Sequence, residues 1–287
     1  MLADKDTNTI YISPFLSQHC PLLYNAMLSL PSRTKESIAV APLPPSFQYI
    51  WCRDYMPIQI ADTEFVAYRF SPDYLRSDKR YRKFICDGTP PMPHCASAYT
   101  MHHIDLIIDG GNVVKCGDTI IMTEKIFHEN ADKSKKDIER MLRDTFHCDF
   151  LFLPWDRAEI FGHSDGVVHY AGNNRVLMTN YEDFSPSVAR TIRNRLDKHF
   201  DVIPLQYHSK RKHQRSWAYI NFLQVGRHIF VPQLGAEEDE QALAQISSAF
   251  PDCETLGIPA LEAVRRGGGV NCITWNVKET HTNKLPT

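Results

Sequence analysis

Four short patches of this 287-residue chain combine acids, a histidine or a cysteine with tight-turn residues, and they recur at nearly equal intervals. Their chemically active members are Asp54, Asp109, His163 with Asp165, and Cys272. Asp54 and Asp109 lie 55 positions apart, and Asp109 and Asp165 lie 56 apart. The step from Asp165 to Cys272 is 107, close to two further intervals. A period of this size predicts stacked or ring-arranged units that each present a polar residue at an equivalent place.

This set of side chains suits nucleophilic attack on a cation. Cys272 is a nucleophile as the thiolate, and His163 can lower its pKa or deliver a proton to a leaving group. Asp54 and Asp165 can hold a guanidinium by paired hydrogen bonds to its planar fork and fix its central carbon for attack. Attack by Cys272 would expel an amine or ammonia and leave a covalent thiouronium. His163 would then activate a water that releases a ureido product.

The segments between the patches repeat the order strand, turn, strand, helix, strand. In the clearest copy, apolar and β-branched runs predict strands over 104–108 and 113–122, the latter interrupted by a turn, a helix over 124–146 and a strand over 150–153. The next two copies are predicted from strands 167–170 and 175–178, helix 186–200 and strand 202–203, and from strands 218–224 and 229–231, helix 237–250 and strand 255–258. Another copy begins with strands 56–60 and 65–70, and its segment up to residue 100, with the basic stretch 75–83 and the proline-rich stretch 90–93, is predicted to be an irregular surface loop or a short helix.

The remaining copy is split between the two ends of the chain. Residues 270–277 supply its first strand, followed by strand 9–13, a helix over 15–30 and strand 38–41. Pairing of the last strand with the first would close a ring and remove exposed sheet edges. We therefore predict a five-bladed α/β propeller formed by residues 1–287 as a single domain. The start of each unit's first strand lies nearest the axis, so the active residues should converge on one pocket.

The same patches resemble the agmatine deiminase and bacterial-type peptidylarginine deiminase family of the guanidino-group-modifying superfamily. The matching segments are Trp51-Cys52-Arg53-Asp54-Tyr55-Met56-Pro57, like W-x-R-D-x-x-P, Asp109-Gly110-Gly111-Asn112, like E-G-G, Gly162-His163-Ser164-Asp165, like G-H-x-D, and Gly267-Gly268-Gly269 before Cys272. The resemblance implies the five-bladed propeller, Cys272 as nucleophile and His163 as general acid and base. It also implies that Asp54 and Asp165 contact the guanidinium.

Three departures from the family pattern concern the substrate more than the chemistry. Asp109 stands where the family has glutamate, and its shorter arm puts the orienting contact with His163 in question. Two residues separate Gly269 from Cys272, as in arginine deiminases, whereas agmatine deiminases have three. Tyr55-Met56 replaces the family's Thr-Gly, and the chain is shorter than typical members.

Aromatic and glycine residues beside the patches are further candidates for ligand contact. Trp51 and Trp217 can stack on a guanidinium or flank the rest of the ligand, although packing in the core is the favoured role for each. Gly268 and Gly269 allow the backbone to approach a ligand closely. The candidate catalytic residues are thus Cys272, His163, Asp165, Asp54 and Asp109, and the candidate substrate-binding residues are Asp54, Asp165, Trp51, Gly268 and Gly269.

Composition narrows the class of protein. A net charge of −2 and a pI near 6.7 argue against a dedicated nucleic-acid or membrane-surface protein. The start of the sequence lacks an apolar signal stretch, so a cytoplasmic protein is expected. The eight cysteines show no C-x-x-C spacing, which predicts reduced thiols and no metal site.

These observations predict a deiminase without metal or cofactor that acts on a small guanidino compound, with agmatine first and arginine, methylarginine or a terminal peptidyl arginine next. Three alternatives remain open. They are an amidinotransferase, a guanidino-binding protein that has lost catalysis, and a nucleic-acid-binding protein that uses the basic segments 75–84 and 208–215. The sequence leaves open whether the chain forms an oligomer.

Overall fold

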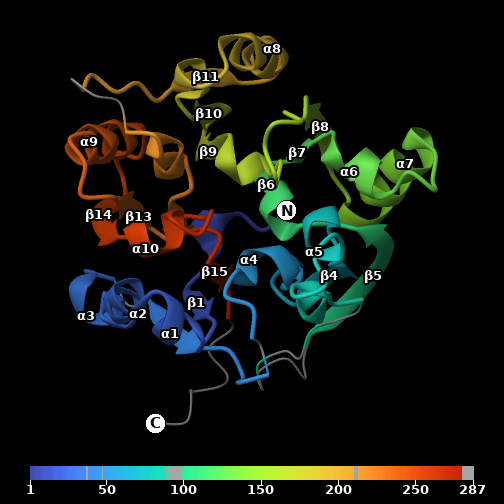
Figure 1. The fold of residues 1–287 in the computed structure, drawn as a ribbon, viewed down its shortest axis with the longest axis horizontal. Coiled ribbons are helices and arrows are strands. Elements are labelled where there is room, and N and C mark those ends of the chain that lie inside the picture. Colours follow the sequence, from blue (N-terminus) through green and yellow to red (C-terminus); the bar gives the residue numbers. More distant parts are fainter. Residues whose placement is uncertain are drawn as a thin grey trace.

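The computed structural model describes residues 1–36, 38–46, 48–87, 90, 93, 99–209 and 213–279. Within this part of the chain the strands form five three-stranded sheets. Figure 1 shows the sheets arranged around a common centre, with the longer helices α7, α8 and α9 on the outside. The predicted five-bladed α/β propeller is confirmed.

All five units share one strand pattern. The first strand runs antiparallel to the second, and the second runs parallel to the third. A parallel pair needs a crossover connection, which the intervening helical segments supply. The units are β3 (Ile58–Ala61), β4 (Glu64–Arg69) and β5 (Thr100–Ile107); β6 (Val114–Cys116), β7 (Thr119–Thr123) and β8 (Asp149–Leu153); β9 (Val168–Gly172), β10 (Arg175–Met178) and β11 (Asp201–Pro204); β12 (Leu223–Val225), β13 (His228–Gln233) and β14 (Glu254–Pro259); and β15 (Thr274–Val277), β1 (Thr9–Ile12) and β2 (Ala39–Pro42).

The fifth unit takes its strands from both ends of the chain, as predicted. β1 pairs antiparallel with β15, from Thr9 opposite Val277 to Ile12 opposite Thr274. The other edge of β1 pairs in parallel with β2. The two ends of the chain therefore share one sheet, and the N-terminus lies near the centre in the view of Figure 1.

The crossover helices pack an apolar face on their sheet. In α7 (Lys135–Phe146) the buried residues Ile138, Leu142 and Phe146 recur at helical spacing, and the Ser134 side chain caps the first turn. The other helices are α1 (Leu16–His19), α2 (Pro21–Leu28), α3 (Leu30–Arg33), α5 (Asp73–Arg76), α6 (Lys125–Glu129), α8 (Pro186–Leu196), α9 (Asp239–Ala249) and α10 (Leu261–Val264).

Two predicted helices and two predicted strands were wrong in extent. The strand expected over 270–277 begins only at Thr274, because the preceding residues form a turn. The helix expected over 124–146 is divided into α6 and α7, because the Asn130 side chain binds the backbone of Ile107 on β5 and of Ile126. The helix expected over 15–30 is broken where Pro21 begins a new one. The strand expected over 218–224 begins as the 3-10 helix η7 (Ser216–Ile220).

Much of the segment predicted to be irregular between residues 71 and 99 lies outside the described residues, including two positions of the proline-rich stretch 90–93. Its described part forms α5 and the 3-10 helix η2 (Arg82–Phe84). In the described part of the chain, no helix is both long and apolar enough to span a membrane.

A short helical turn precedes the first strand of four units, at the position where the sequence places its polar patches. These turns are α4 (Cys52–Tyr55), η4 (Gly110–Asn112), η5 (Ser164–Gly166) and η7. Their close packing requires glycine, since a Cβ atom on Gly110 would lie 2.0 Å from the carbonyl oxygen of Arg53. The polar patches therefore meet through these turns, ahead of the strands rather than on them.

Candidate active site

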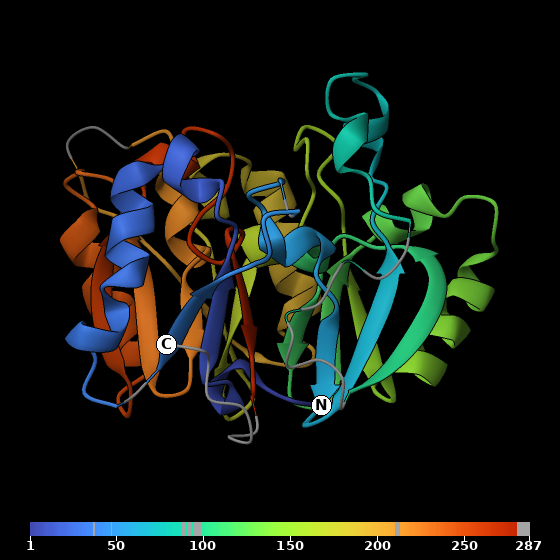
Figure 2. The same ribbon diagram turned by 90° about the horizontal axis from the view of Figure 1, so that it is seen from below.

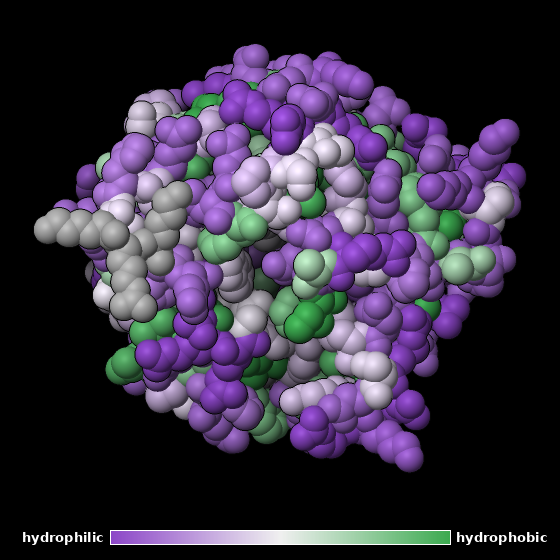
Figure 3. Space-filling view, turned by 45° about the horizontal axis from the view of Figure 1, so that its top comes forward, coloured by the Kyte–Doolittle hydropathy of each residue, from purple (hydrophilic) through white to green (hydrophobic). Residues whose placement is uncertain are grey.

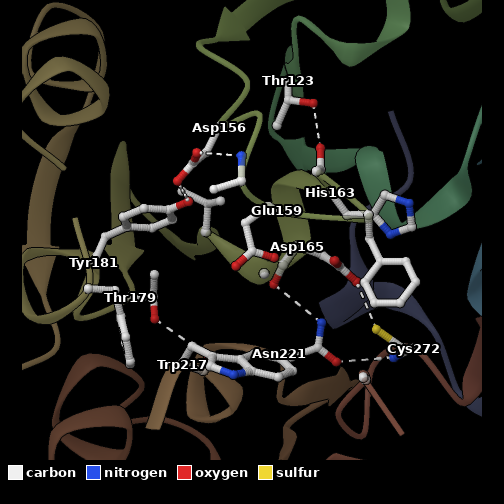
Figure 4. Close-up of a pocket in the computed structure, with 18 of the residues that line it drawn as sticks. Thr123, Asp156, Glu159, His163, Asp165, Thr179, Tyr181, Trp217, Asn221 and Cys272 are labelled. Atoms are coloured by element: carbon white, nitrogen blue, oxygen red, sulfur yellow. Dashed lines mark hydrogen bonds between the residues drawn. The ribbon is translucent and has the colours of Figure 1, made fainter. Parts of the chain in front are cut away.

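One cavity of about 510 Å³ collects most of the predicted site residues. Asp54, His163, Asp165 and Cys272 all line it, although up to 218 positions separate them in the sequence. Figure 3 shows a hollow near the middle of one face, and Figure 4 shows Asp165 and Cys272 side by side inside the cavity. Asp109 is not part of the lining but lies behind His163.

Asp109 reaches His163 despite its short side chain. Its Oδ2 atom lies 2.9 Å from Nε2 of His163, and both side chains are buried. The other ring nitrogen, Nδ1, lies 3.7 Å from Oδ1 of Asp54. His163 is therefore held between two carboxylates, and the concern raised by aspartate in place of glutamate does not apply to this contact.

Gly111 makes the approach of Asp54 to His163 possible. Its backbone N–H donates to Oδ1 of Asp54 at 3.3 Å. A Cβ atom at this position would lie 2.6 Å from Nδ1 of His163 and 2.8 Å from the Asp54 carboxylate. The Gly-Gly pair after Asp109 thus leaves room for the histidine and its second carboxylate.

Cys272 and Asp165 form the opposite side of the cavity base. The thiol Sγ lies 3.6 Å from Oδ2 of Asp165, which also accepts a hydrogen bond from the Asn271 side chain at 2.8 Å. Two carboxylates, an imidazole and a thiol thus share one buried space. A planar cation could contact both carboxylates while its carbon faces the sulfur.

The electrostatics of this base favour a cationic ligand. Burial raises the pKa of Asp54 to about 7, and the charges of Asp109 and Asp165 add to the rise against the attraction of His163. Burial alone would lower the pKa of His163, but Asp54 and Asp109 outweigh it and raise that pKa to about 9. At neutral pH the imidazole therefore holds its proton next to a carboxyl group that is partly protonated.

Cys272 is a thiol rather than a thiolate in this environment. Burial raises its pKa well above the ordinary value, and the carboxylates of Asp165 and Asp54 raise it further. A cation placed between these carboxylates would oppose their effect. The nucleophile is thus poised to be activated by a positively charged ligand.

Asn221 is a site residue that the sequence analysis missed. Its Oδ1 accepts hydrogen bonds from the backbone N–H groups of Gly269 and Cys272, at 3.1 and 3.2 Å. Its Nδ2 donates to the backbone oxygen of Asp165 at 3.3 Å. Asn221 lies 56 positions after Asp165, so the repeat interval itself pointed to it.

Lys125 on α6 is a second missed residue. Its side chain is 1% exposed, and its Nζ lies 3.1 Å from Oδ2 of Asp109 and 2.7 Å from Oε1 of Glu129. No turn motif or repeat position marked it, and a lysine in a short helix is ordinarily solvent-facing.

Of the tryptophans and glycines predicted to contact the substrate, three line the cavity and one does not. Trp51, Trp217 and Gly268 line the cavity. A Cβ atom on Gly268 would lie 2.4 Å from the Trp51 ring, so this glycine makes room for the indole. Gly269 is absent from the lining, and its N–H binds Asn221 instead. Its role in the structure is to anchor the loop that carries Cys272.

The mouth of the cavity has a different composition from its base. Asp156 and Glu159 add two further acids, and Asp156 accepts a hydrogen bond from the Tyr181 hydroxyl at 2.8 Å. Figure 4 shows the Glu159 carboxylate directed into the cavity. Phe161 and Phe184 contribute apolar walls. Among the described residues that line the cavity there is no lysine or arginine.

The basic segments considered for nucleic-acid binding are partly engaged within the protein. In segment 75–84, Arg76 pairs with Glu129 at 2.6 Å and Arg80 pairs with Asp78 at 2.6 Å. Residues 210–212 of the second segment lie outside the described part of the chain.

The fold and the site define a class of protein: an α/β propeller with a cysteine, a histidine and carboxylates converging on one axial cavity. The sequence of residues 18–277 matches the profile of the Porphyromonas-type peptidyl-arginine deiminase family. The chain belongs to this family.

Individual relatives agree with that assignment. A Marinomonas protein named "putative agmatine deiminase" is 25% identical over 222 residues, which cover 64% of this chain and 60% of the relative. The chain thus matches less than two thirds of the length of this curated relative. Among solved structures, the agmatine deiminase of Enterococcus faecalis superposes with a TM-score of 0.73 at 20% identity, covering 97% of this chain and 95% of that one. A cysteine-to-serine variant of C. jejuni agmatine deiminase with substrate bound gives 0.75 at 15% identity, covering 97% and 96%.

Proposed function

We propose that this protein is a deiminase that hydrolyses the guanidino group of a small cationic substrate to a ureido group and ammonia, through a covalent intermediate on Cys272. The observation that carries this proposal is the joint position of Cys272, His163 and the carboxylates of Asp54 and Asp165 around one buried cavity base.

Substrate binding and nucleophile activation are coupled in this arrangement. A guanidinium held by Asp54 and Asp165 supplies a positive charge that balances the negative charge of both carboxylates. The same charge lowers the pKa of the neighbouring Cys272, so that the thiol loses its proton to solvent when the cation is bound. The thiolate then attacks the central guanidinium carbon.

His163 has the geometry and the protonation state of a general acid. Its Nε2 faces Asp109, so its Nδ1 is directed toward Asp54 and the cavity. We assign it the transfer of the Nδ1 proton to the leaving nitrogen, which departs as ammonia and leaves the thiouronium. The neutral imidazole then removes a proton from water, and the hydroxide adds to the same carbon. Expulsion of the Cys272 thiolate, with loss of the proton of the added hydroxyl to solvent, releases the ureido product.

The charge at the cavity mouth supports agmatine ahead of arginine as the substrate. Asp156 and Glu159 favour a distal amine, and no cationic side chain among the described lining residues offers a partner for a carboxylate. Curated relatives named for agmatine deiminase support the same choice. Arginine, methylarginines and a terminal peptidyl arginine are the next candidates.

An ammonia-release assay over agmatine, arginine, methylarginines and arginine peptides tests the proposal, run with Cys272→Ala beside the wild type. The wild type should consume agmatine most efficiently, and the alanine variant should consume nothing. A ureido product with free ammonia identifies hydrolysis, whereas a new guanidino compound formed only with an added amine identifies amidinotransfer. Turnover that survives in Cys272→Ala contradicts the mechanism, and binding without turnover in the wild type identifies a binding protein.

Three earlier expectations stay predictions. They are that residues 1–287 form a single domain, that the protein is cytoplasmic, and that neither nucleic acid nor a membrane is a partner. The oligomeric state also stays open.

A further inference from the structure

A buried cation lies behind the histidine and carboxylate pair of the site. We propose that Lys125 is a positioning residue for the deimination reaction, holding Asp109 ionised and turned toward His163. The inference rests on the proposed function, because it concerns the same His163. The effect of Lys125 on Asp109 and His163 can nevertheless be measured in the absence of turnover.

Lys125 is placed to act on Asp109 from the side opposite the cavity. Its ammonium lies 3.1 Å from Oδ2 of Asp109, the same oxygen that lies 2.9 Å from Nε2 of His163. The lysine is also close to Glu129 at 2.7 Å and to Asp73 at 3.3 Å. These contacts fix the ammonium at the end of α6, away from water.

Asp109 depends on this cation more than an ordinary carboxylate would. Its side chain is 3% exposed, and its Oδ1 atom is buried with no hydrogen-bond partner among the described residues. A buried carboxylate is stable in its charged form only when it is paired and hydrogen-bonded. Burial would raise the pKa of Asp109, yet Lys125 and His163 outweigh it and lower that pKa.

Other titratable and charged groups lie near Lys125, Asp109 and His163 and contribute to the electrostatics of the three residues. Tyr74 on α5 covers both partners, with its ring 5.1 Å from the Lys125 ammonium and 6.3 Å from the His163 ring. The titratable and charged groups around Asp109 and His163, from each element packed against them, are Asp54 on α4, Asp165 on η5, Tyr68 on β4, Asp73, Tyr74 and Arg76 on α5, Lys125 and Glu129 on α6, and Tyr49 and Cys272.

The charge of Asp109 determines how the His163 ring is oriented and therefore where its Nδ1 proton is directed. While Asp109 is ionised it can only accept, so Nε2–H is held toward it and Nδ1 stays directed to the cavity. A protonated Asp109 could instead donate, and the ring would lose its fixed orientation. Lys125 thus acts on the reaction through Asp109 and does not touch the substrate.

Three variants separate this role from simple stabilisation. Lys125→Met removes the charge, and Lys125→Arg keeps it. Glu129→Gln is the matched control, since it loosens the same cluster at its other end but leaves the ammonium beside Asp109. If the methionine variant does not fold, Lys125→Gln replaces it, because it keeps polarity and most of the length.

The kinetic arm measures kcat and KM for agmatine against pH. In Lys125→Met we expect kcat to fall about 10- to 100-fold, as for other residues that orient a catalytic group, with KM changed less than about twofold. In the substrate complex the bound cation keeps Asp54 ionised, so the acidic limb of kcat, unlike that of kcat/KM, reports Asp109. Loss of the Lys125 charge raises the pKa of Asp109 and should move this limb to higher pH. Lys125→Arg should restore most of kcat, and Glu129→Gln should keep the wild-type acidic limb even if its Tm falls.

The second arm needs no substrate and therefore does not depend on the proposed function. In ¹⁵N-histidine-labelled protein, the Nε2–H resonance of His163, assigned by its loss in His163→Asn, should persist to lower pH in the wild type than in Lys125→Met. Equal persistence in both proteins overturns the proposal, as does an equal shift in Glu129→Gln. A wild type without turnover that still shows the expected NMR difference leaves the Lys125 inference standing and refutes only the deiminase assignment.

Discussion

The base and the mouth of the cavity are built by different parts of the fold. The base comes from the turns that precede the first strands, and Asp54, His163, Asp165 and Cys272 there are between 5% and 9% exposed. The mouth comes from the connections after β8 and β10, where Ile160 is 69% exposed. The difference supports the proposal that the repeated turns carry the reaction chemistry and that the connections after β8 and β10 select the substrate.

The largest effect is expected at the base. Asp165→Asn removes a carboxylate that contacts the Cys272 thiol and is proposed to hold the guanidinium, so kcat/KM for agmatine should fall about 10³-fold or more. Steady-state kinetics measure the change. Asp156→Asn at the mouth is the matched control, and an equal loss in both variants would remove the distinction between base and mouth.

A smaller loss of activity is expected at Asn221, which holds the loop that carries Cys272 at the base of the cavity. Asn221→Ala frees the N–H groups of Gly269 and Cys272, so the loop that carries the nucleophile should lose its fixed position. We expect kcat to fall about 10- to 100-fold with KM nearly unchanged. Steady-state kinetics measure the change, and full activity in the variant would show that the loop is held by other contacts.

The pH dependence reports on the base alone. Asp54 must be ionised to hold the cation, so kcat/KM should rise with pH through about 7, the raised pKa of that carboxyl. His163 must be protonated to donate, so kcat/KM should fall again above about 9. Outside this window the rate should change about tenfold per pH unit. Asp54→Asn should abolish the acidic limb, and a limb that persists in this variant would assign it to another group.

At the mouth the expected change is in binding rather than in chemistry. Glu159→Gln removes one of two acids near the opening, so KM for agmatine should rise about tenfold while kcat stays within about twofold. Arginine, whose carboxylate is repelled by these acids, should become a relatively better substrate. A fall in kcat instead would place Glu159 in the chemistry.

The smallest effect is expected at Ile160, which is exposed beside the opening but does not line the cavity. Ile160→Ser should alter kcat/KM for agmatine less than about twofold, because an exposed side chain outside the cavity makes no contact with a small ligand. A larger loss, measured in the same assay, would extend the mouth outward and imply a longer substrate.

Much of the fold was predictable because the repeat places turn residues and polar residues in the same register. Gly110 and Gly111 marked a tight turn beside Asp109, and the structure shows that both glycines lie where this turn meets α4 and His163. Asn221 was missed because no acid, histidine or cysteine accompanies it, although it stands at the repeat interval. The repeat interval alone, without a recognisable motif, does not identify a single site residue.

The remaining errors have tertiary causes. Asn130 ends α6 because its side chain binds Ile107 on a neighbouring unit, a contact that helix propensity does not encode. Lys125 was overlooked for a related reason, since its partners Asp109 and Asp73 come from other elements. The contact of Gly269 with the ligand stays a prediction, and the hydrogen bond of its N–H to Asn221, 48 positions away, is a tertiary contact that the sequence did not signal.

The antiparallel pairing of β1 with β15 also constrains biosynthesis. Cys272 lies two residues before β15, which pairs with a strand far earlier in the chain. An unfinished polypeptide that ends between Cys272 and β15 would already hold every proposed catalytic side chain, yet the sheet next to the Cys272 turn would lack its edge strand. Docking of β15 is therefore expected to fix the position of the sulfur, which links reactivity to completion of this sheet.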